Sequence, residues 1–127
     1  EYLRSTISKE RIVVVSSSVS PRDHFDLISQ MDICLGMRYH FVLFAVASAI
    51  PVVAIEYSVK VAREMELCAL SQYGLALVDF SATKAMTLLA KASADEELEA
   101  KLVLAAKSAR EGAISGAGVF REKLADV

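Results

Sequence analysis

Short apolar runs of strand character alternate with helix-like runs along this chain, and this alternation limits the folds open to it. Strand-like runs, rich in β-branched or other apolar residues, occupy 11–16, 32–35, 52–55 and 75–78. Between them lie stretches whose apolar residues recur at helical spacing. Strands that alternate with helices form a parallel sheet covered by helices on both faces. The sequence therefore predicts an α/β fold with a parallel sheet of about four strands and flanking helices.

The helix signals fall in the gaps between these strands and after the last one. We expect helices over 21–30, 41–49, 60–72 with Gly74 as its C-cap, and 82–89 with Ser81 as its N-cap. A capping box at Ser93–Glu96 predicts a long terminal helix, with a break near the glycines at 112, 116 and 118 before a last short helix at 120–125. We treat 1–127 as a single α/β domain in which 94–127 is a terminal helical segment.

Composition excludes several classes of protein. The 127 residues are 54% hydrophobic and 24% charged, which is typical of one globular domain. The net charge of −2 and the lack of a basic block argue against a nucleic-acid partner. The longest apolar run has about ten residues, too few to span a bilayer. Cys34 and Cys68 lie in apolar surroundings without metal-ligand spacing, so we expect buried thiols, no metal, and a reducing, cytoplasmic compartment.

One loop carries the chemistry of an anion site. Gly36, Arg38 and His40 follow the second predicted strand and precede a helix. A helix N-terminus favours an anion, an arginine grips a carboxylate or phosphate with two hydrogen bonds, and a histidine can exchange a proton near neutral pH. Tyr57 and Lys60 follow the next strand and should lie beside this loop. The residues alone leave a structural interpretation open, in which Arg38 pairs with a local acid and His40 satisfies a buried carbonyl.

The spacing of these residues resembles a known family. The segment 32–40, the alanine-rich stretch 45–49, the run 51–57 and Lys60 are similar to the pattern of polysaccharide pyruvyl transferases. That pattern has an aspartate before a strand, a glycine, Arg-x-His, an alanine-rich helix, Pro-Val-Val-Ala-Ile and Tyr-Asp-Pro-Lys. This chain has Tyr57-Ser58-Val59-Lys60 at the last motif, and Glu56 where a small residue is usual.

The resemblance implies a fold and an activity. Family members resemble two-domain GT-B glycosyltransferases, and this chain would be part of the second, Rossmann-like domain. They transfer a pyruvyl group from phosphoenolpyruvate to a sugar hydroxyl as a ketal, in cell-surface or exopolysaccharide synthesis. By resemblance, Arg38 would hold the carboxylate or phosphate of this donor substrate and His40 would act as general acid or bind the phosphate. Gly36, Tyr57 and Lys60 would complete donor binding, and no cofactor is implied.

The resemblance also implies partners. The chain would carry only the donor-side half of the site, so the full-length protein would be the enzyme and the isolated chain would be inactive. A missing N-terminal domain would bind the saccharide acceptor, and a lipid-linked acceptor would bring the protein to the inner face of the membrane. An exposed sheet edge could form a homodimer. Two alternatives stay open: a nucleotide-sugar GT-B glycosyltransferase or epimerase, and a non-catalytic anion-binding or assembly module.

Overall fold

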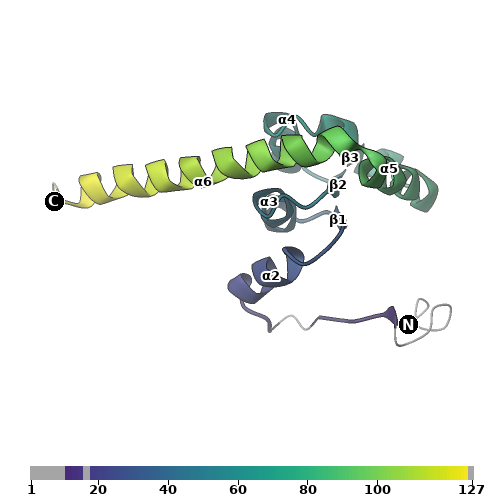
Figure 1. Cartoon of the computed structure of the whole chain (residues 1–127), viewed down its shortest axis with the longest axis horizontal. Coiled ribbons are helices and arrows are strands. Elements are labelled where there is room, and N and C mark those ends of the chain that lie inside the picture. The colour runs from purple at the N-terminus through teal and green to yellow at the C-terminus, as the bar shows by residue number, and fades with distance from the viewer. Residues whose placement is uncertain (1–10, 16–17, 126–127) are drawn as a thin grey trace.

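The fold is a three-stranded parallel sheet with helices around it (Figure 1). The computed structural model describes residues 11–15 and 18–125, with side chains described as far as 112. The strands, in the spatial order β1-β2-β3, are β1 (Cys34–Gly36), β2 (Val52–Glu56) and β3 (Gly74–Ala76). The helices are α2 (Pro21–Ile28), α3 (Tyr39–Ala47), α4 (Val59–Leu67), α5 (Ala82–Ala94) and α6 (Glu96–Ala125), with short 3-10 turns at Ser71–Tyr73 and Leu77–Asp79. The predicted α/β class and the parallel sheet are confirmed.

The helices form layers on the two faces of the sheet. Helices α3 and α4 connect successive parallel strands and pack on one face, while α5 packs on β1 and β2 from the other (Figure 1). Helix α2 lies beside α3, and α6 crosses α3 before its C-terminal half projects away from the body (Figure 1). This arrangement places α3 at the centre of one side of the molecule.

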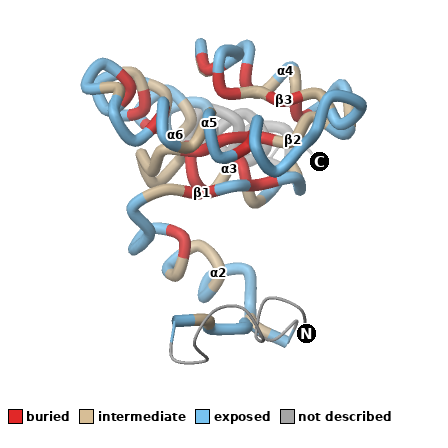
Figure 2. The backbone as a smooth tube through the Cα atoms, turned by 90° about the vertical axis from the view of Figure 1, so that its right-hand side faces the viewer, coloured by how far each residue is buried: buried red, intermediate tan, exposed pale blue. Residues whose placement is uncertain are grey.

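The core lies where α3 meets the sheet, as the red segments of Figure 2 show. Val42, Ala45 and Val46 of α3 are buried against β2, whose first three residues, 52–54, are also buried. Helix α6 closes the core with Leu98 and Leu102, both of which are buried. The apolar character of 41–49 on every side therefore reflects burial between the sheet and other helices.

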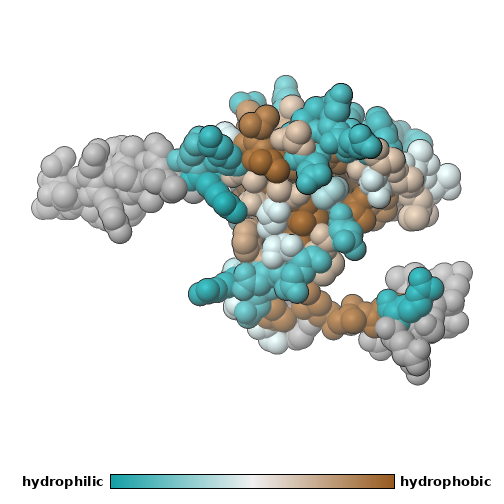
Figure 3. Space-filling model, in the orientation of Figure 1, coloured by the Kyte–Doolittle hydropathy of each residue, from teal (hydrophilic) through white to brown (hydrophobic). Residues whose placement is uncertain are grey.

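The first predicted strand, at 11–16, is wrong for the residues that the structure describes. Residues 12–15 have no strand assignment, and the Val13 and Val14 side chains are 87% and 67% exposed. Figure 3 shows this apolar segment, in brown, outside the body of the molecule. A strand needs a neighbour for its backbone hydrogen bonds, and none of the described strands pairs with the outer edge of β1. The sheet accordingly has three strands, and a homodimer through this edge stays a prediction.

Two helices end in a way that the sequence analysis did not predict. Helix α4 ends at Leu67, well before Gln72, and Ala69 adopts a left-handed φ of 56°. The Leu70 N–H donates to the Met65 carbonyl and the Ala69 N–H to the Glu66 carbonyl, which together form a Schellman motif. Helix α3 ends in the same way, with Ala49 also at a φ of 56°. The expected C-cap at Gly74 is therefore wrong, because Gly74 begins β3 instead.

The terminal helix also differs from the prediction. Asp95, not Ser93, caps it, since the Asp95 Oδ1 accepts the Glu97 N–H at 3.0 Å. The helix continues without a break through 112–118, because glycine weakens a helix by about 1 kcal/mol but, unlike proline, removes no hydrogen bond. Glu97 and Lys101, four residues apart on this helix, form an ion pair at 3.6 Å. Neither this helix nor any other in the described part of the chain is long and apolar enough to cross a membrane.

A partly buried hydrogen bond joins the start of β3 to the junction of α5 and α6. Tyr73 is fully buried, and its hydroxyl donates to Asp95 Oδ2. Burial and this bond raise the pKa of Tyr73 to about 12. The same bond is the main cause that lowers the pKa of Asp95 below its ordinary value.

Replacing Ala69 with glycine should stabilise the protein. An L-residue in the left-handed region costs about 1–2 kcal/mol, which glycine avoids, although glycine also gains entropy in the unfolded chain. We expect Ala69→Gly to raise the free energy of unfolding by about 0.5–1 kcal/mol in urea titrations. The matched control is Ala62→Gly in the interior of α4, which should lower it by about 1 kcal/mol. Equal destabilisation by both substitutions would contradict the Schellman assignment.

Replacing Tyr73 with phenylalanine should lower stability and flatten its pH dependence. Because the pKa of Tyr73 is raised from 10.0 to about 12 in the folded protein, the wild type loses stability as pH rises between these values. Because the pKa of Asp95 is lowered, the wild type also loses stability as pH falls through and below 3.8. Tyr73→Phe should lower the thermal midpoint by about 4 °C near neutral pH and lessen both losses.

The control for this substitution is Tyr57→Phe, at an exposed tyrosine, which should leave the thermal midpoint nearly unchanged. An unchanged midpoint for Tyr73→Phe would show that the Tyr73–Asp95 bond does not support the fold.

Candidate functional site

Two strand-to-helix loops lie side by side at the carboxyl edge of the sheet. The first runs from Gly36 of β1 to the start of α3, and the second runs from Glu56 of β2 to the start of α4. Since β1 and β2 are parallel neighbours, both loops leave the same edge. Arg38 and Ser58 are the two N-cap residues, and neither makes a side-chain capping hydrogen bond. Both helices therefore direct their positive ends and uncapped backbone N–H groups at this edge.

Gly36 holds the start of α3 against the sheet. A Cβ atom at this position would lie 2.5 Å from Phe41 Cδ1 and 3.3 Å from Val42 Cγ2. Gly36 does not have a positive φ, so close packing, and not a special turn, requires the glycine. Its contact with Phe41 fixes where the first turn of α3 begins.

Arg38 and His40 lie at this helix start and are exposed. Arg38 precedes the first helical residue, and His40 is the second. The His40 ring lies 5.4 Å from the Tyr39 ring and 6.5 Å from the Phe44 ring, measured between centroids. Among the residues whose side chains are described, no acid lies within ion-pair distance of Arg38. The local ion pair considered for Arg38 is thus not seen there, and the exposure of His40 disfavours a buried role.

Lys60 joins the second loop to the first. Its Nζ lies 4.3 Å from the centroid of the Tyr39 ring, a cation–π contact between the starts of α4 and α3. The Tyr39 hydroxyl donates to Glu64 Oε2 at 3.2 Å. Burial, followed by the Glu64 charge and this hydrogen bond, raises the pKa of Tyr39. The contact brings Lys60 next to the residue that separates Arg38 from His40.

Tyr39 and Glu64 were not among the residues predicted for the site. The signal that could have found them is the four-residue spacing of Lys60 and Glu64 on one helix, together with an aromatic residue at the start of the preceding helix. Tyr57, which was predicted, is 45% exposed and its backbone N–H donates to the Ile55 carbonyl. The structure places Tyr57 on the second loop without joining it to the contact between Lys60 and Tyr39.

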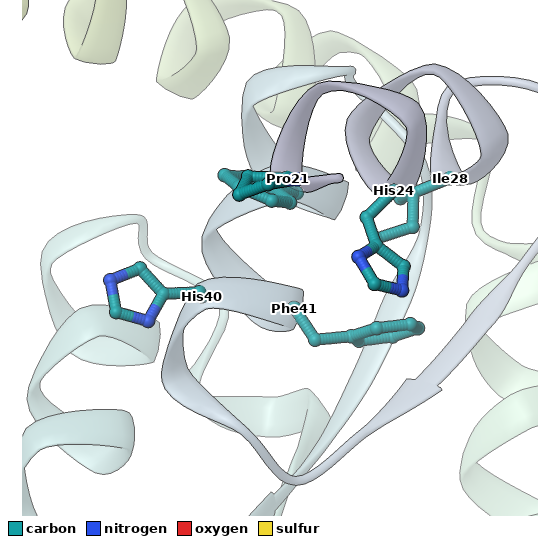
Figure 4. Close-up of a pocket in the computed structure, with 6 residues that line it drawn as sticks. Pro21, His24, Ile28, His40 and Phe41 are labelled. Carbon is teal, nitrogen blue, oxygen red and sulfur yellow. The ribbon is translucent and has the colours of Figure 1, made fainter. Parts of the chain in front are cut away.

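A cavity of about 490 Å³ adjoins His40 between α2 and α3 (Figure 4). Its lining is mainly apolar and comprises Pro21, His24, Ile28, His40, Phe41 and Phe44. Figure 4 shows the His40 ring turned away from His24, while the Phe41 ring lies below that of His24. His24, which lines the α2 side of this cavity, was not predicted as a site residue. The cavity has the size and apolar lining of a ligand pocket.

The cysteines and acids offer no second site within the described residues. No group of three histidine, cysteine or acidic side chains in that part of the chain could hold a metal ion. Both cysteines are free thiols, Cys34 buried and Cys68 half-buried. Burial raises the pKa of Cys34, while burial and the neighbouring Glu64 raise that of Cys68 to about 11. Thiols with raised pKa values are poor nucleophiles at neutral pH.

Comparison with known proteins gives one match. The family model described as polysaccharide pyruvyl transferase matches residues 1–59. No curated protein and no solved structure matches the chain. The matched segment includes Gly36, Arg38, His40 and Tyr57, and Lys60 lies one residue beyond its end. The match covers 59 of the 127 residues and supports the resemblance to polysaccharide pyruvyl transferases found in the sequence.

Proposed function

We propose that this chain provides the phosphoenolpyruvate-binding part of a pyruvyl transferase. In this proposal the whole protein transfers a pyruvyl group to a sugar as a ketal during polysaccharide synthesis. The family match supports a transferase of polysaccharide biosynthesis. The donor, the ketal and the division of the site between domains are the parts that we propose.

One observation carries the proposal. The contact between Lys60 Nζ and the Tyr39 ring brings a second cation to the helix start that already holds Arg38 and His40. Phosphoenolpyruvate has two anionic groups, a carboxylate and a phosphate, and two cations at adjacent helix N-termini match that pattern. Two cations close together repel each other, so this arrangement is favourable only when an anion binds between them.

The proposed roles follow from the chemistry of the donor. Arg38 and the backbone N–H groups at the start of α3 hold one anionic group, and Lys60 attracts the other. His40 donates a proton to the methylene carbon of the enol, which leaves the adjacent carbon cationic and open to attack by a sugar hydroxyl. The first sugar hydroxyl bonds to that carbon and returns its proton to His40. The bond from that carbon to the phosphate oxygen then breaks, the second hydroxyl bonds to the same carbon, and its proton leaves with the phosphate. Gly36 acts indirectly, because it sets the position of the helix start.

The remaining parts of the site lie outside this chain in our proposal. An N-terminal domain supplies the residues that bind the saccharide acceptor, so the isolated chain binds the donor without turning it over. The protein acts in the cytoplasm, at the inner face of the membrane where the acceptor is lipid-linked. The unpaired edge of β1, among the described strands, is where we propose a second copy docks.

Arg38→Ala should weaken binding of phosphoenolpyruvate to this chain by about tenfold or more, because a charge-assisted, two-pronged contact is lost. Isothermal titration calorimetry measures this directly. The control is Arg110→Ala, an exposed arginine on α6, which should bind as the wild type does. Equal affinity of the wild type and Arg38→Ala would contradict the site.

Activity separates this proposal from its alternatives. In the protein that contains this chain and its N-terminal domain, His40→Ala should reduce pyruvyl transfer by about a hundredfold, as loss of a general acid predicts. Turnover of a nucleotide sugar, with none of phosphoenolpyruvate, would indicate a glycosyltransferase or epimerase. Arg38-dependent anion binding with no turnover of either compound would indicate a binding module.

A further inference from the structure

Lys60 and Glu64 have the spacing of an ion pair but do not form one. They lie four residues apart on α4, where an ammonium and a carboxylate commonly meet on the helix surface. The ion pairs among the described side chains do not include this pair. Lys60 Nζ lies instead over the Tyr39 ring, 4.3 Å from its centroid.

Two donors occupy the Glu64 carboxylate in place of Lys60. The Tyr39 hydroxyl donates to Oε2 at 3.2 Å, and the Cys68 thiol lies 3.8 Å from Oε1. The same tyrosine thus contacts both members of the potential pair, with its ring facing Lys60 and its hydroxyl facing Glu64. A ring face attracts a cation but carries no net charge, so Lys60 keeps its full positive charge for another partner.

We propose that Tyr39 and Glu64 are positioning residues that keep Lys60 out of a helix-surface ion pair and available to an anion at the start of α3. This inference rests on the proposed function, because the anion is the phosphoenolpyruvate held by Arg38. Loss of the Tyr39 hydroxyl frees Glu64 to attract Lys60, which cancels the charge that the ligand needs. In this proposal the contacts of Tyr39 with Lys60 and Glu64 raise the affinity for the ligand more than they stabilise the fold.

A second trio in the same chain provides a matched comparison. Lys91 and Asp95 are also four residues apart, Lys91 Nζ lies 5.5 Å from the Tyr73 ring centroid, and the Tyr73 hydroxyl donates to Asp95. Tyr73 immediately precedes β3, so this trio lies toward the amino edge of the sheet, away from Arg38. Only the first trio lies at the proposed site, so the second trio supplies a matched control.

The test is a cycle of variants titrated with phosphoenolpyruvate. Tyr39→Phe keeps the ring and removes the hydroxyl, and should weaken binding by about threefold, the scale of one exposed ion pair. Adding Glu64→Gln to Tyr39→Phe removes the competing charge and should restore affinity to within about twofold of the wild type. Glu64→Gln alone should bind at least as tightly as the wild type. In a Lys60→Ala background, Tyr39→Phe should have no further effect.

The outcomes separate failure of this inference from failure of the proposed function. Lys91→Ala should bind as the wild type does, and the thermal midpoint of each variant shows that it is folded. Unchanged affinity in Tyr39→Phe, failure of Glu64→Gln to restore it, or weakened binding by Glu64→Gln alone would each overturn the inference while leaving Arg38-dependent binding intact. If the wild type binds neither phosphoenolpyruvate nor inorganic phosphate, the proposed function and this inference both fail.

Discussion

The packing of α3 into the centre of the molecule is the constraint on which the rest of the structure depends. Its residues are apolar on nearly every side, so the helix is stable only when the sheet, α4, α6 and α2 cover it. The exposed fraction of Val42, Ala45 and Val46 is at most 1%. Because Gly36 has no side chain, nothing at this position holds the first turn of α3 away from β1. The position of the helix start, and with it Arg38 and His40, is therefore fixed by the core.

The place of the proposed site, at the carboxyl ends of β1 and β2, follows from this packing. A parallel sheet brings the starts of α3 and α4 to the same edge, and the contact between Lys60 and Tyr39 joins them. Each helix start supplies a partial positive charge, and each loop supplies a cationic side chain. The charges gather at a place where the backbone is held rigidly, which is what binding of a small dianion requires. An apolar cavity lies beside His40, between α2 and α3.

Features that depend on neighbouring residues were predictable from the sequence, while those that depend on contacts between distant residues were not. The strands predicted at 32–35 and 52–55 correspond to β1 at 34–36 and β2 at 52–56, and the Ser81 cap was also predicted. The Glu97–Lys101 pair likewise depends only on nearby residues. The strand at 11–16 was predicted wrongly because strand pairing depends on neighbours distant in the sequence. Ala69 ends α4 in a conformation that propensity assigns to glycine. Tyr39 was not predicted as a site residue because its two partners, Lys60 and Glu64, lie on another helix.

The most direct test of the proposed anion site is a map of the backbone amide resonances of this chain during a titration with phosphoenolpyruvate. The amides of Tyr39, His40 and Phe41, at the uncapped start of α3, should shift first and furthest, followed by those of Val59 and Lys60. Saturable shifts confined to these two helix starts would support the account. Shifts centred elsewhere, such as at Ser48 and Lys107 near the opposite end of α3, or no shifts at all, would contradict it.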